Sequence, residues 1–124
     1  MANTSNLPQN FSIAQDTDDV INGTIITDIA NATLVGSTME WCLYPSLYGG
    51  PTQTTPILTK TSHSGGDVTI LPTPPMSFTI RIHASDTFGL ALGNYYHEAV
   101  VTDPGGARTR PWFGLMTLTQ TQNP

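Results

Sequence analysis

The segment 92–103 limits the fold of this chain more than any other stretch of its sequence. It reads Leu-Gly-Asn-Tyr-Tyr-His-Glu-Ala-Val-Val-Thr-Asp and leads directly into a Pro-Gly-Gly turn at 104–106. A glycine near the start, aromatic and β-branched residues along the length and a turn at the end are typical of a strand in an antiparallel sheet. We therefore expect a central strand here, with the other strands of the chain paired on either side of it.

Two further segments, 38–44 and 76–83, alternate apolar and polar residues with the period of two that a half-buried strand requires. The first is expected to end at Pro45, because proline cannot donate a hydrogen bond to a ladder. The alternation also predicts which side chains line the interior. The predicted core residues are Met39, Trp41, Phe78, Ile80, Ile82, Tyr95 and Val101.

Shorter strands are expected between turns spaced by about eight to twelve residues, a spacing typical of β-sandwiches. Gly23 and Gly114 lie inside two of these strands and are predicted to form β-bulges. A helical turn is predicted at 85–90. The remaining strands are predicted at 11–15, 20–27, 57–61, 67–71 and 108–120.

Two aromatic residues narrow the fold class. Trp41 on a middle strand and Tyr95 near the start of a late strand are similar to the core aromatics of immunoglobulin-like domains. We predict an all-β fold, an antiparallel immunoglobulin-like β-sandwich of seven to eight strands, without the usual disulfide because Cys42 is the one cysteine. The sandwich is expected to span 9–120, between a polar N-terminal arm at 1–8 and a polar C-terminal tail at 121–124.

The charge of the chain argues against binding to nucleic acid or to a membrane. Lysine and arginine together number 4 against 9 acidic residues, for a net charge of -5. So few cations cannot neutralise many phosphates or hold the chain on an anionic lipid surface. No apolar run approaches the ~20 residues of a membrane helix, and residues 1–10 lack the basic and apolar regions of a signal peptide. We expect a soluble protein made in the cytoplasm.

Metal sites are not supported by the spacing of the potential ligands. The acidic turn 16–19 partly matches a calcium loop, but the glycine and the distal glutamate of that loop are missing. A solvated turn is predicted instead. His83 and His97 fall on opposite faces by alternation, so they cannot share a tetrahedral zinc ion with Cys42. We expect His97 to be an inner, hydrogen-bonded residue and His83 to lie at the surface.

No catalytic constellation is present either. The chain has no Gly-x-Ser-x-Gly elbow for a serine nucleophile. Cys42 has no neighbouring cation in sequence to lower its pKa, and it is expected to be an inert thiol. Glu40 and Glu98 are single, outward-facing strand residues rather than a pair held in a cleft. We therefore predict that the protein is not an enzyme and needs no cofactor.

Surface contacts with other proteins are the remaining possibility. An uncharged loop after the strand at 38–44 contains tyrosine, leucine and proline, and such loops are frequent binding sites. Trp112 and Phe113 are adjacent on the last strand, so one sheet face cannot bury both. One of them is expected on a bulged segment or facing outward, where it either covers the edge of the core or contacts a neighbouring subunit. The predicted interaction residues are Tyr44, Leu47, Tyr48, Trp112 and Phe113.

With these residues placed, the chain resembles the small immunoglobulin-like β-sandwich modules of tailed-phage structural proteins, such as the N-terminal domains of baseplate upper proteins and tail-associated or head–tail proteins. The matching features are an early strand with an acidic turn at 11–19, the alternating strand of Trp41, the apolar strand at 78–82, and a closing strand with Gly114. The most specific match is Gly-x-Tyr…Val-Thr-Asp-x-x-Gly within 93–106.

The resemblance implies a non-enzymatic virion component, a tail/baseplate or head–tail adaptor or a fibre-anchoring subunit, with other virion proteins as partners. It implies a place in the virion and a homo-oligomer in the assembled particle, whose edge strands can pair with a neighbour. A capsid decoration protein is an alternative of the same type. A carbohydrate-binding module with Trp112, Tyr48 and Tyr96 as stacking platforms is an alternative of another class, and a small hydrolase has no support.

Overall fold

The computed structural model describes a chain that is mostly strand, with one short helix in the described part. It describes residues 9–25, 35–47, 50–51, 55–63, 66–71 and 77–120, and at 46, 47, 50, 51 and 111 it describes the backbone alone. The arm predicted at 1–8 and the tail predicted at 121–124 lie outside these residues. The elements are β1 (Phe11–Ala14), β2 (Asp19–Thr24), β3 (Thr38–Leu47), β4 (Gly50–Pro51), β5 (Leu58–Thr61), β6 (Val68–Leu71), β7 (Ser77–Ile82), α1 (Ala84–Thr87), β8 (Gly93–Thr102) and β9 (Arg108–Thr119).

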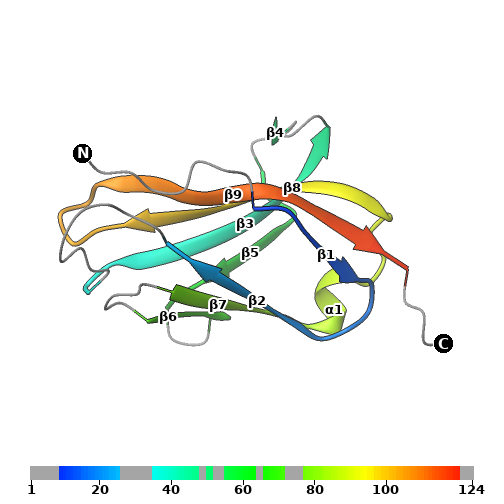
Figure 1. The fold of residues 1–124 in the computed structure, drawn as a ribbon, viewed down its shortest axis with the longest axis horizontal. Coiled ribbons are helices and arrows are strands. Elements are labelled where there is room, and N and C mark those ends of the chain that lie inside the picture. Colours follow the sequence, from blue (N-terminus) through cyan, green and yellow to red (C-terminus); the bar gives the residue numbers. More distant parts are fainter. Residues whose placement is uncertain are drawn as a thin grey trace.

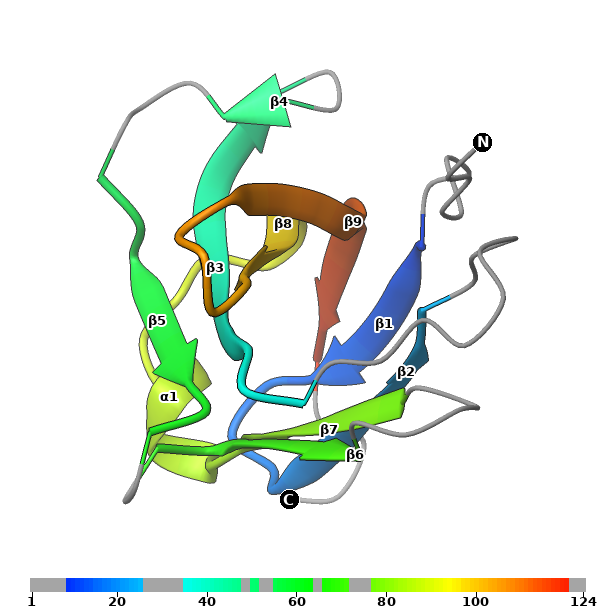
Figure 2. The ribbon, with the colours of Figure 1, turned by 90° about the vertical axis from the view of Figure 1, so that its left-hand side faces the viewer.

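The strands form two sheets that face each other (Figures 1 and 2). The larger, six-stranded sheet has the order β1-β9-β8-β3, with β4 and β5 both paired to β3. The smaller sheet has the order β2-β7-β6. The strand predicted at 92–103 is β8, and it lies between β3 and β9 at the centre of the larger sheet, as expected. Among the described residues, α1 is far too short to cross a membrane.

The core between the sheets confirms the predicted alternation. All seven residues predicted to line it are 9% exposed or less. Tyr95 also donates from its hydroxyl to the carbonyl of Ala91, at 2.5 Å. This is the bond of a tyrosine corner, in which a tyrosine near the start of a late strand reaches back to the backbone upstream. The strand order and this corner make the fold an immunoglobulin-like β-sandwich.

Two finer parts of the fold prediction are wrong. The described chain has nine strands rather than seven to eight, because the short β4 adds a hairpin at the end of β3. The sandwich is also not fully antiparallel, since β1 pairs in parallel with β9, Phe11 lying beside Met116. The turn after β1 carries the chain to the smaller sheet, so β1 is left at the edge of the larger sheet with the last strand as its partner.

Pro45 does not end its strand, contrary to the prediction. β3 continues to Leu47, and Pro45 lies opposite Tyr95 of β8. The carbonyl of Leu43 accepts from the N–H of Ile57, so Leu43 and Pro45 direct their backbone groups toward the side of β5. The pairing of β3 with β5 ends at Leu43. The missing N–H of Pro45 therefore costs no bond to β8, and the strand tolerates the proline.

Gly23 and Gly114 were predicted to form bulges, but both lie in regular register, Gly23 opposite Phe78 and Gly114 opposite His97. Each glycine instead makes room for a neighbour. A Cβ on Gly23 would lie 2.7 Å from ring carbons of Phe78, and one on Gly114 would lie 2.7 Å from the backbone N and C of Gln9. The irregularity between β8 and β9 is elsewhere, between Ala99 and Val101 of β8.

His97 is an inner, hydrogen-bonded residue, as expected, and its ring joins three segments. It is fully buried. Its Nδ1 accepts a hydrogen bond from Nε1 of Trp41 at 3.2 Å, and its Nε2 donates to the carbonyl of Gln9 at 2.6 Å. Burial lowers the pKa of His97 to about 4, although the bond to Gln9 favours the charged form. A proton on Nδ1 would also remove the acceptor that Trp41 uses.

We predict that His97 makes the stability of the chain depend on pH. The unfolded chain binds a proton at His97 below the ordinary pKa of 6.5, whereas the folded chain resists protonation down to a pKa of about 4. Stability is therefore fully present above pH 6.5 and is lost as the pH falls toward 4, by about 3 kcal/mol. Urea unfolding at several pH values measures this. His97→Gln should be less stable at neutral pH and lack this part of the pH dependence, while His83→Gln at the half-exposed His83 should keep it.

A second prediction concerns Gly114. A Cβ at this position would displace the backbone of Gln9, which also donates from its N–H to the carbonyl of Phe113. Gly114→Ala should lower the free energy of unfolding by about 1 to 3 kcal/mol, the usual cost of overpacking. Gly105→Ala is the matched control, because its Cβ would lie 3.4 Å from Oδ1 of Asp103, an ordinary contact. Equal stability of the two variants would contradict the proposed close approach.

Candidate interaction surface

The outward face of the larger sheet gathers aromatic and charged side chains from β3, β8 and β9. Cross-strand register places Tyr44 opposite Tyr96 and Glu98 opposite Phe113, and Arg110 of β9 reaches the same face. Because side chains alternate along each strand, these residues point away from the core. We call them the outer-face cluster: Tyr44, Tyr96, Glu98, Arg110 and Phe113.

Arg110 is the centre of the outer-face cluster. Its Nη1 donates to the hydroxyl oxygen of Tyr96 at 2.6 Å and lies 3.6 Å from Oε1 of Glu98. Its guanidinium carbon lies 4.7 Å from the ring centroid of Phe113, a cation–π distance. The Tyr96 hydroxyl in turn donates to Glu98 at 3.0 Å. The side chain of Arg110 is half exposed, so the ion pair itself adds little stability.

The two tyrosines of the cluster remain neutral at ordinary pH. Burial raises the pKa of Tyr44 to about 12, and burial together with the hydrogen bond to Glu98 raises that of Tyr96 to about 12. Their rings lie 6.1 Å apart, centroid to centroid, at an angle of 42°. The phenols are thus hydrogen-bonding groups and apolar surface rather than acids or bases. The cluster is suited to contact, and its groups do not form a nucleophile with a base.

The structure brings together part of the predicted interaction set. Tyr44 and Phe113 lie on the same face, both half-buried. Trp112 does not belong to that face, because its side chain is 4% exposed and its ring meets that of Phe78 edge-on at 5.0 Å in the core. Leu47 is described in its backbone alone, at the end of β3, and Tyr48 lies outside the described residues.

The aromatic platform expected for carbohydrate binding is not formed by the described side chains. Trp112 is part of the core, and Tyr96 is 2% exposed. A ring that stacks on a sugar needs an open face, and these two rings have none. The third residue of that set, Tyr48, lies outside the described part of the chain.

The residues considered for a metal site lie in three separate places. His97 is in the core, Cys42 is buried on the outward side of the larger sheet, and His83 is half exposed beside α1. In the described part of the chain, no group of three His, Cys, Asp or Glu side chains is placed to hold a metal ion.

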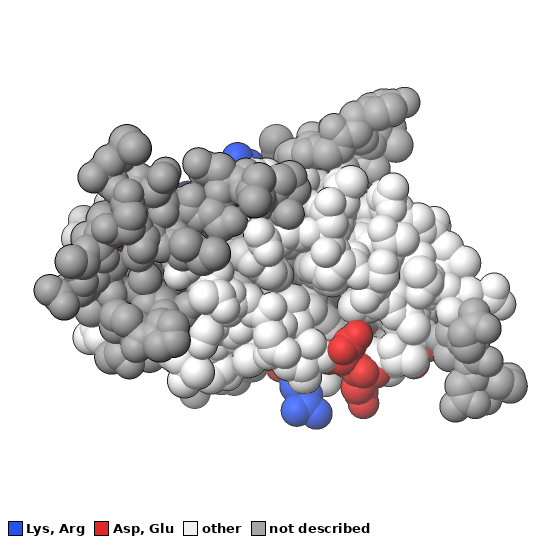
Figure 3. All heavy atoms as spheres, viewed as in Figure 1, with Lys and Arg blue, Asp and Glu red and all other residues white. Residues whose placement is uncertain are grey.

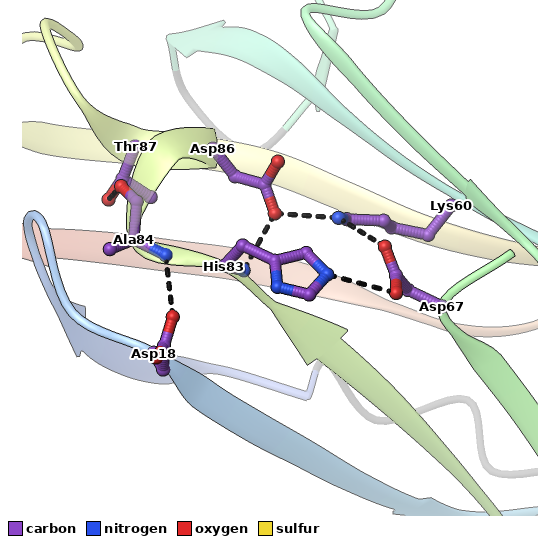
Figure 4. Close-up of polar contacts among 7 residues, drawn as sticks. All are labelled: Asp18, Lys60, Asp67, His83, Ala84, Asp86 and Thr87. Atoms are coloured by element: carbon purple, nitrogen blue, oxygen red, sulfur yellow. Dashed lines mark hydrogen bonds and ion pairs between the residues drawn. The ribbon is translucent and has the colours of Figure 1, made fainter.

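Two residues of the acidic turn 16–19, Asp16 and Asp18, are hydrogen-bonded to residues of α1. Asp16 has a positive φ of 61°, and its N–H donates to Oγ1 of Thr87 at 2.9 Å. Oδ1 of Asp18 accepts from the N–H of Ala84 at 2.9 Å, as Figure 4 shows. Oδ1 of Asp19 accepts from the N–H of Val20 at 2.8 Å. The carboxylates of Asp18 and Asp19 thus accept hydrogen bonds from backbone N–H groups of the protein.

A buried lysine links the two sheets at the same end of the molecule (Figure 4). Nζ of Lys60 in β5 lies 2.8 Å from Asp67, just before β6, and 2.6 Å from Asp86 of α1. Nε2 of His83 lies 3.0 Å from the other oxygen of Asp67. The hydrogen bond from Lys60, with that from His83, lowers the pKa of Asp67. The ammonium group of Lys60 is therefore paired with two carboxylates. Because removing one partner of a buried ion pair is strongly destabilising, this contact holds α1 against β5.

No protein-family model matches this sequence, and no curated protein matches it either. Among solved structures, the chain is similar to the fibronectin(III)-like modules of Clostridium thermocellum CbhA, with 18% identity, 98% of this chain and 47% of that chain covered, and a TM-score of 0.44. It is also similar to murine CRIg, with 14% identity, 98% of both chains covered and a TM-score of 0.36. The chain spans about half the length of the first of these.

We predict that the thiol of Cys42 reacts slowly. Burial raises its pKa, and the nearby carboxylate of Glu40 opposes the thiolate further, although a hydrogen bond with Thr59 acts in the other direction. The reaction of the folded chain with Ellman's reagent at mildly alkaline pH should be at least about tenfold slower than that of the chain unfolded in urea, since the thiolate is the nucleophile. Equal rates in the two states would show that the thiol is not shielded.

Proposed function

We propose that this chain is a non-enzymatic structural protein of a phage virion, a tail/baseplate or head–tail adaptor or a fibre-anchoring subunit. In this role it joins neighbouring virion proteins through the outer-face cluster. The observation that supports the proposal most directly is the gathering of Tyr44, Phe113 and Arg110 on the outward face of the larger sheet. Tyrosine, phenylalanine and arginine are the residue types enriched at protein interfaces.

The polar groups of this face favour burial against a partner. The Tyr96 hydroxyl and the Arg110 guanidinium already have partners within the cluster. A neighbour that covers the face therefore removes water from groups that keep their hydrogen bonds, and it avoids the penalty of an unsatisfied buried donor or acceptor. The half-buried rings of Tyr44 and Phe113 add apolar area to the contact.

The virion assignment itself rests on the resemblance of 93–106 to modules of tailed-phage structural proteins. In the structure this segment is β8 with the turn after it. Tyr95 makes the corner bond to Ala91, and the turn is closed by the N–H of Gly106 donating to the carbonyl of Asp103 at 2.9 Å. The residues of the resemblance are thus ones that shape the sandwich. They support a shared fold with those modules, and the outer-face cluster supports the assembly role.

Removal of the two half-buried rings should weaken incorporation into particles. We expect Tyr44→Ala combined with Phe113→Ala to reduce the amount of chain in purified virions, with a loss of binding of about 2 kcal/mol, roughly thirtyfold, if the rings are interface hot spots. The measurement is quantitative mass spectrometry of particles from a phage that lacks the gene and is complemented by each variant.

Leu71→Ala combined with Leu92→Ala is the matched control, because both leucines are more than half exposed and lie outside the cluster. It should be incorporated like the unaltered chain. Absence of the unaltered chain from particles would overturn the virion role. Normal incorporation of the Tyr44 and Phe113 variant would overturn the assignment of this face.

A further inference from the structure

The edge of the smaller sheet at β2 has no partner strand among the described residues. β2 pairs with β7 over its full length, from Asp19 opposite Ile82 to Thr24 opposite Ser77, without a bulge. On its other side β2 approaches β1, which belongs to the larger sheet (Figure 2). A groove of about 300 Å³, lined by residues of both strands, separates the two. β1 therefore does not continue the ladder of the smaller sheet.

Two hydrogen bonds show which backbone groups of β2 face this open side. The N–H of Arg81 in β7 donates to the carbonyl of Asp67, so the backbone groups of Arg81 point toward β6 and away from Val20, its neighbour on β2. The N–H of Val20 donates to the carboxylate of Asp19 rather than to β7. In an antiparallel ladder such positions alternate. Val20, Asn22 and Thr24 thus direct their N–H and carbonyl groups outward.

From Val20 onward, β2 itself carries none of the charges, prolines or bulges that usually protect an edge strand. Natural edges are blocked by lysine, proline, bulges or covering segments. The residues from Val20 to Thr24 contain neither charge nor proline, and Val20 is 51% exposed. By contrast, the sequence places Pro72 directly after the edge strand β6. Figure 3 shows the face on which β1 and β2 lie, and its described part is uncharged except at its rims.

We propose that a second copy of this chain pairs with β2, its own β2 running antiparallel to the first about a two-fold axis at Asn22. The Asn22 N–H of each copy then donates to the Asn22 carbonyl of the other. Val20 pairs with Thr24 of the other copy on either side, where the N–H of Val20 exchanges the carboxylate of its own Asp19 for the carbonyl of Thr24. The two small sheets become one continuous sheet, in which β2 is no longer an edge.

The residues of this edge are suited to pairing with a second copy of β2. They are uncharged from Val20 to Thr24, so they offer no charge that would select a strand of another protein. An isologous contact requires a self-complementary surface. Here a β-branched residue meets a β-branched residue, since Val20 lies opposite Thr24, and an amide meets an amide at Asn22. The two copies of Asp19 lie at opposite ends of the ladder, roughly 20 Å apart at the rise of a strand, so their charges do not meet.

The biological use of this dimer rests on the assembly role proposed above. The formation of the dimer does not depend on that role. The pairing uses the smaller sheet, whereas the outer-face cluster lies on the larger one. An experiment on the purified chain in solution therefore tests the pairing separately, and the incorporation of variants into particles tests the virion role.

The test is sedimentation velocity of the full chain over a wide range of concentration, at moderate salt to screen the net charge. We expect the unaltered chain to shift from monomer to dimer as concentration rises. Asn22→Lys and Asn22→Glu should each stay monomeric, because each places like charges directly opposite across the two-fold axis. A mixture of the two variants should recover the dimer, since lysine then meets glutamate.

Thr69→Lys is the matched control. Thr69 and Asn22 flank Thr79 on the same exposed face of the smaller sheet, one on each outer strand. It should dimerise like the unaltered chain, and loss of its dimer would move the contact to β6 and overturn the proposal. A dimer that survives in both Asn22 variants overturns it as well. Circular dichroism melts confirm that the variants fold.

Hydrogen exchange gives an independent readout. The amides of Asn22 and Thr24 should become protected as the concentration of the unaltered chain rises, and they should stay unprotected in Asn22→Lys. A chain that remains monomeric at every concentration overturns the proposal. If those amides are already protected at the lowest concentration, the edge is filled from within the chain or by another protein, and the proposal is equally overturned.

Discussion

The buried imidazole of His97 is the contact on which the larger sheet depends for holding its edge strand β1 in place. It accepts from Trp41 of β3 and donates to Gln9, the residue that leads into β1. In immunoglobulin domains the second cysteine of the core disulfide lies two residues after the corner tyrosine, and His97 lies two residues after Tyr95. A neutral ring, with one donor and one acceptor both used, thus stands where immunoglobulin domains have that cysteine, and it joins strands of one sheet rather than two sheets. Gly114 leaves the space through which Gln9 reaches it.

The sequence predicted this core well because alternation is a local property. Trp41 and Phe78 are buried by the period of their own strands, whatever strands lie beside them. The two strand glycines were misread for the opposite reason. A glycine inside a strand indicates either a bulge or the close approach of another group, and only the three-dimensional structure shows Phe78 over Gly23 and Gln9 over Gly114. Likewise, Pro45 was read without knowledge of where the pairing with β5 ends.

The interaction surface was predicted in part. The errors of the prediction come from the register between strands, which the sequence does not provide. Tyr44 and Phe113 are on the outward face, but their common location depends on the pairing of β3 with β8 and of β8 with β9. No local pattern provides that pairing, so Arg110 was missed and Tyr96 was named only for the alternative of carbohydrate binding. Adjacent residues on a strand point to opposite faces, and a one-residue slip exchanges them. The bulge between β8 and β9 adds such a slip just before Trp112, so its inward direction could not be read from its neighbours.

The two proposed contacts, the outer-face cluster and the edge of β2, lie on different sheets and do not compete. In a continuous antiparallel sheet the two-fold axis is perpendicular to the sheet, so both copies present the same face to the same side. A pair joined through β2 therefore keeps its two larger sheets on one side, with both outer-face clusters free. A partner with repeated sites can then bind both clusters at once, and its second binding step becomes intramolecular. A small interface of modest affinity is sufficient under these conditions, which suits a sandwich whose cluster presents two half-buried rings and one half-exposed arginine.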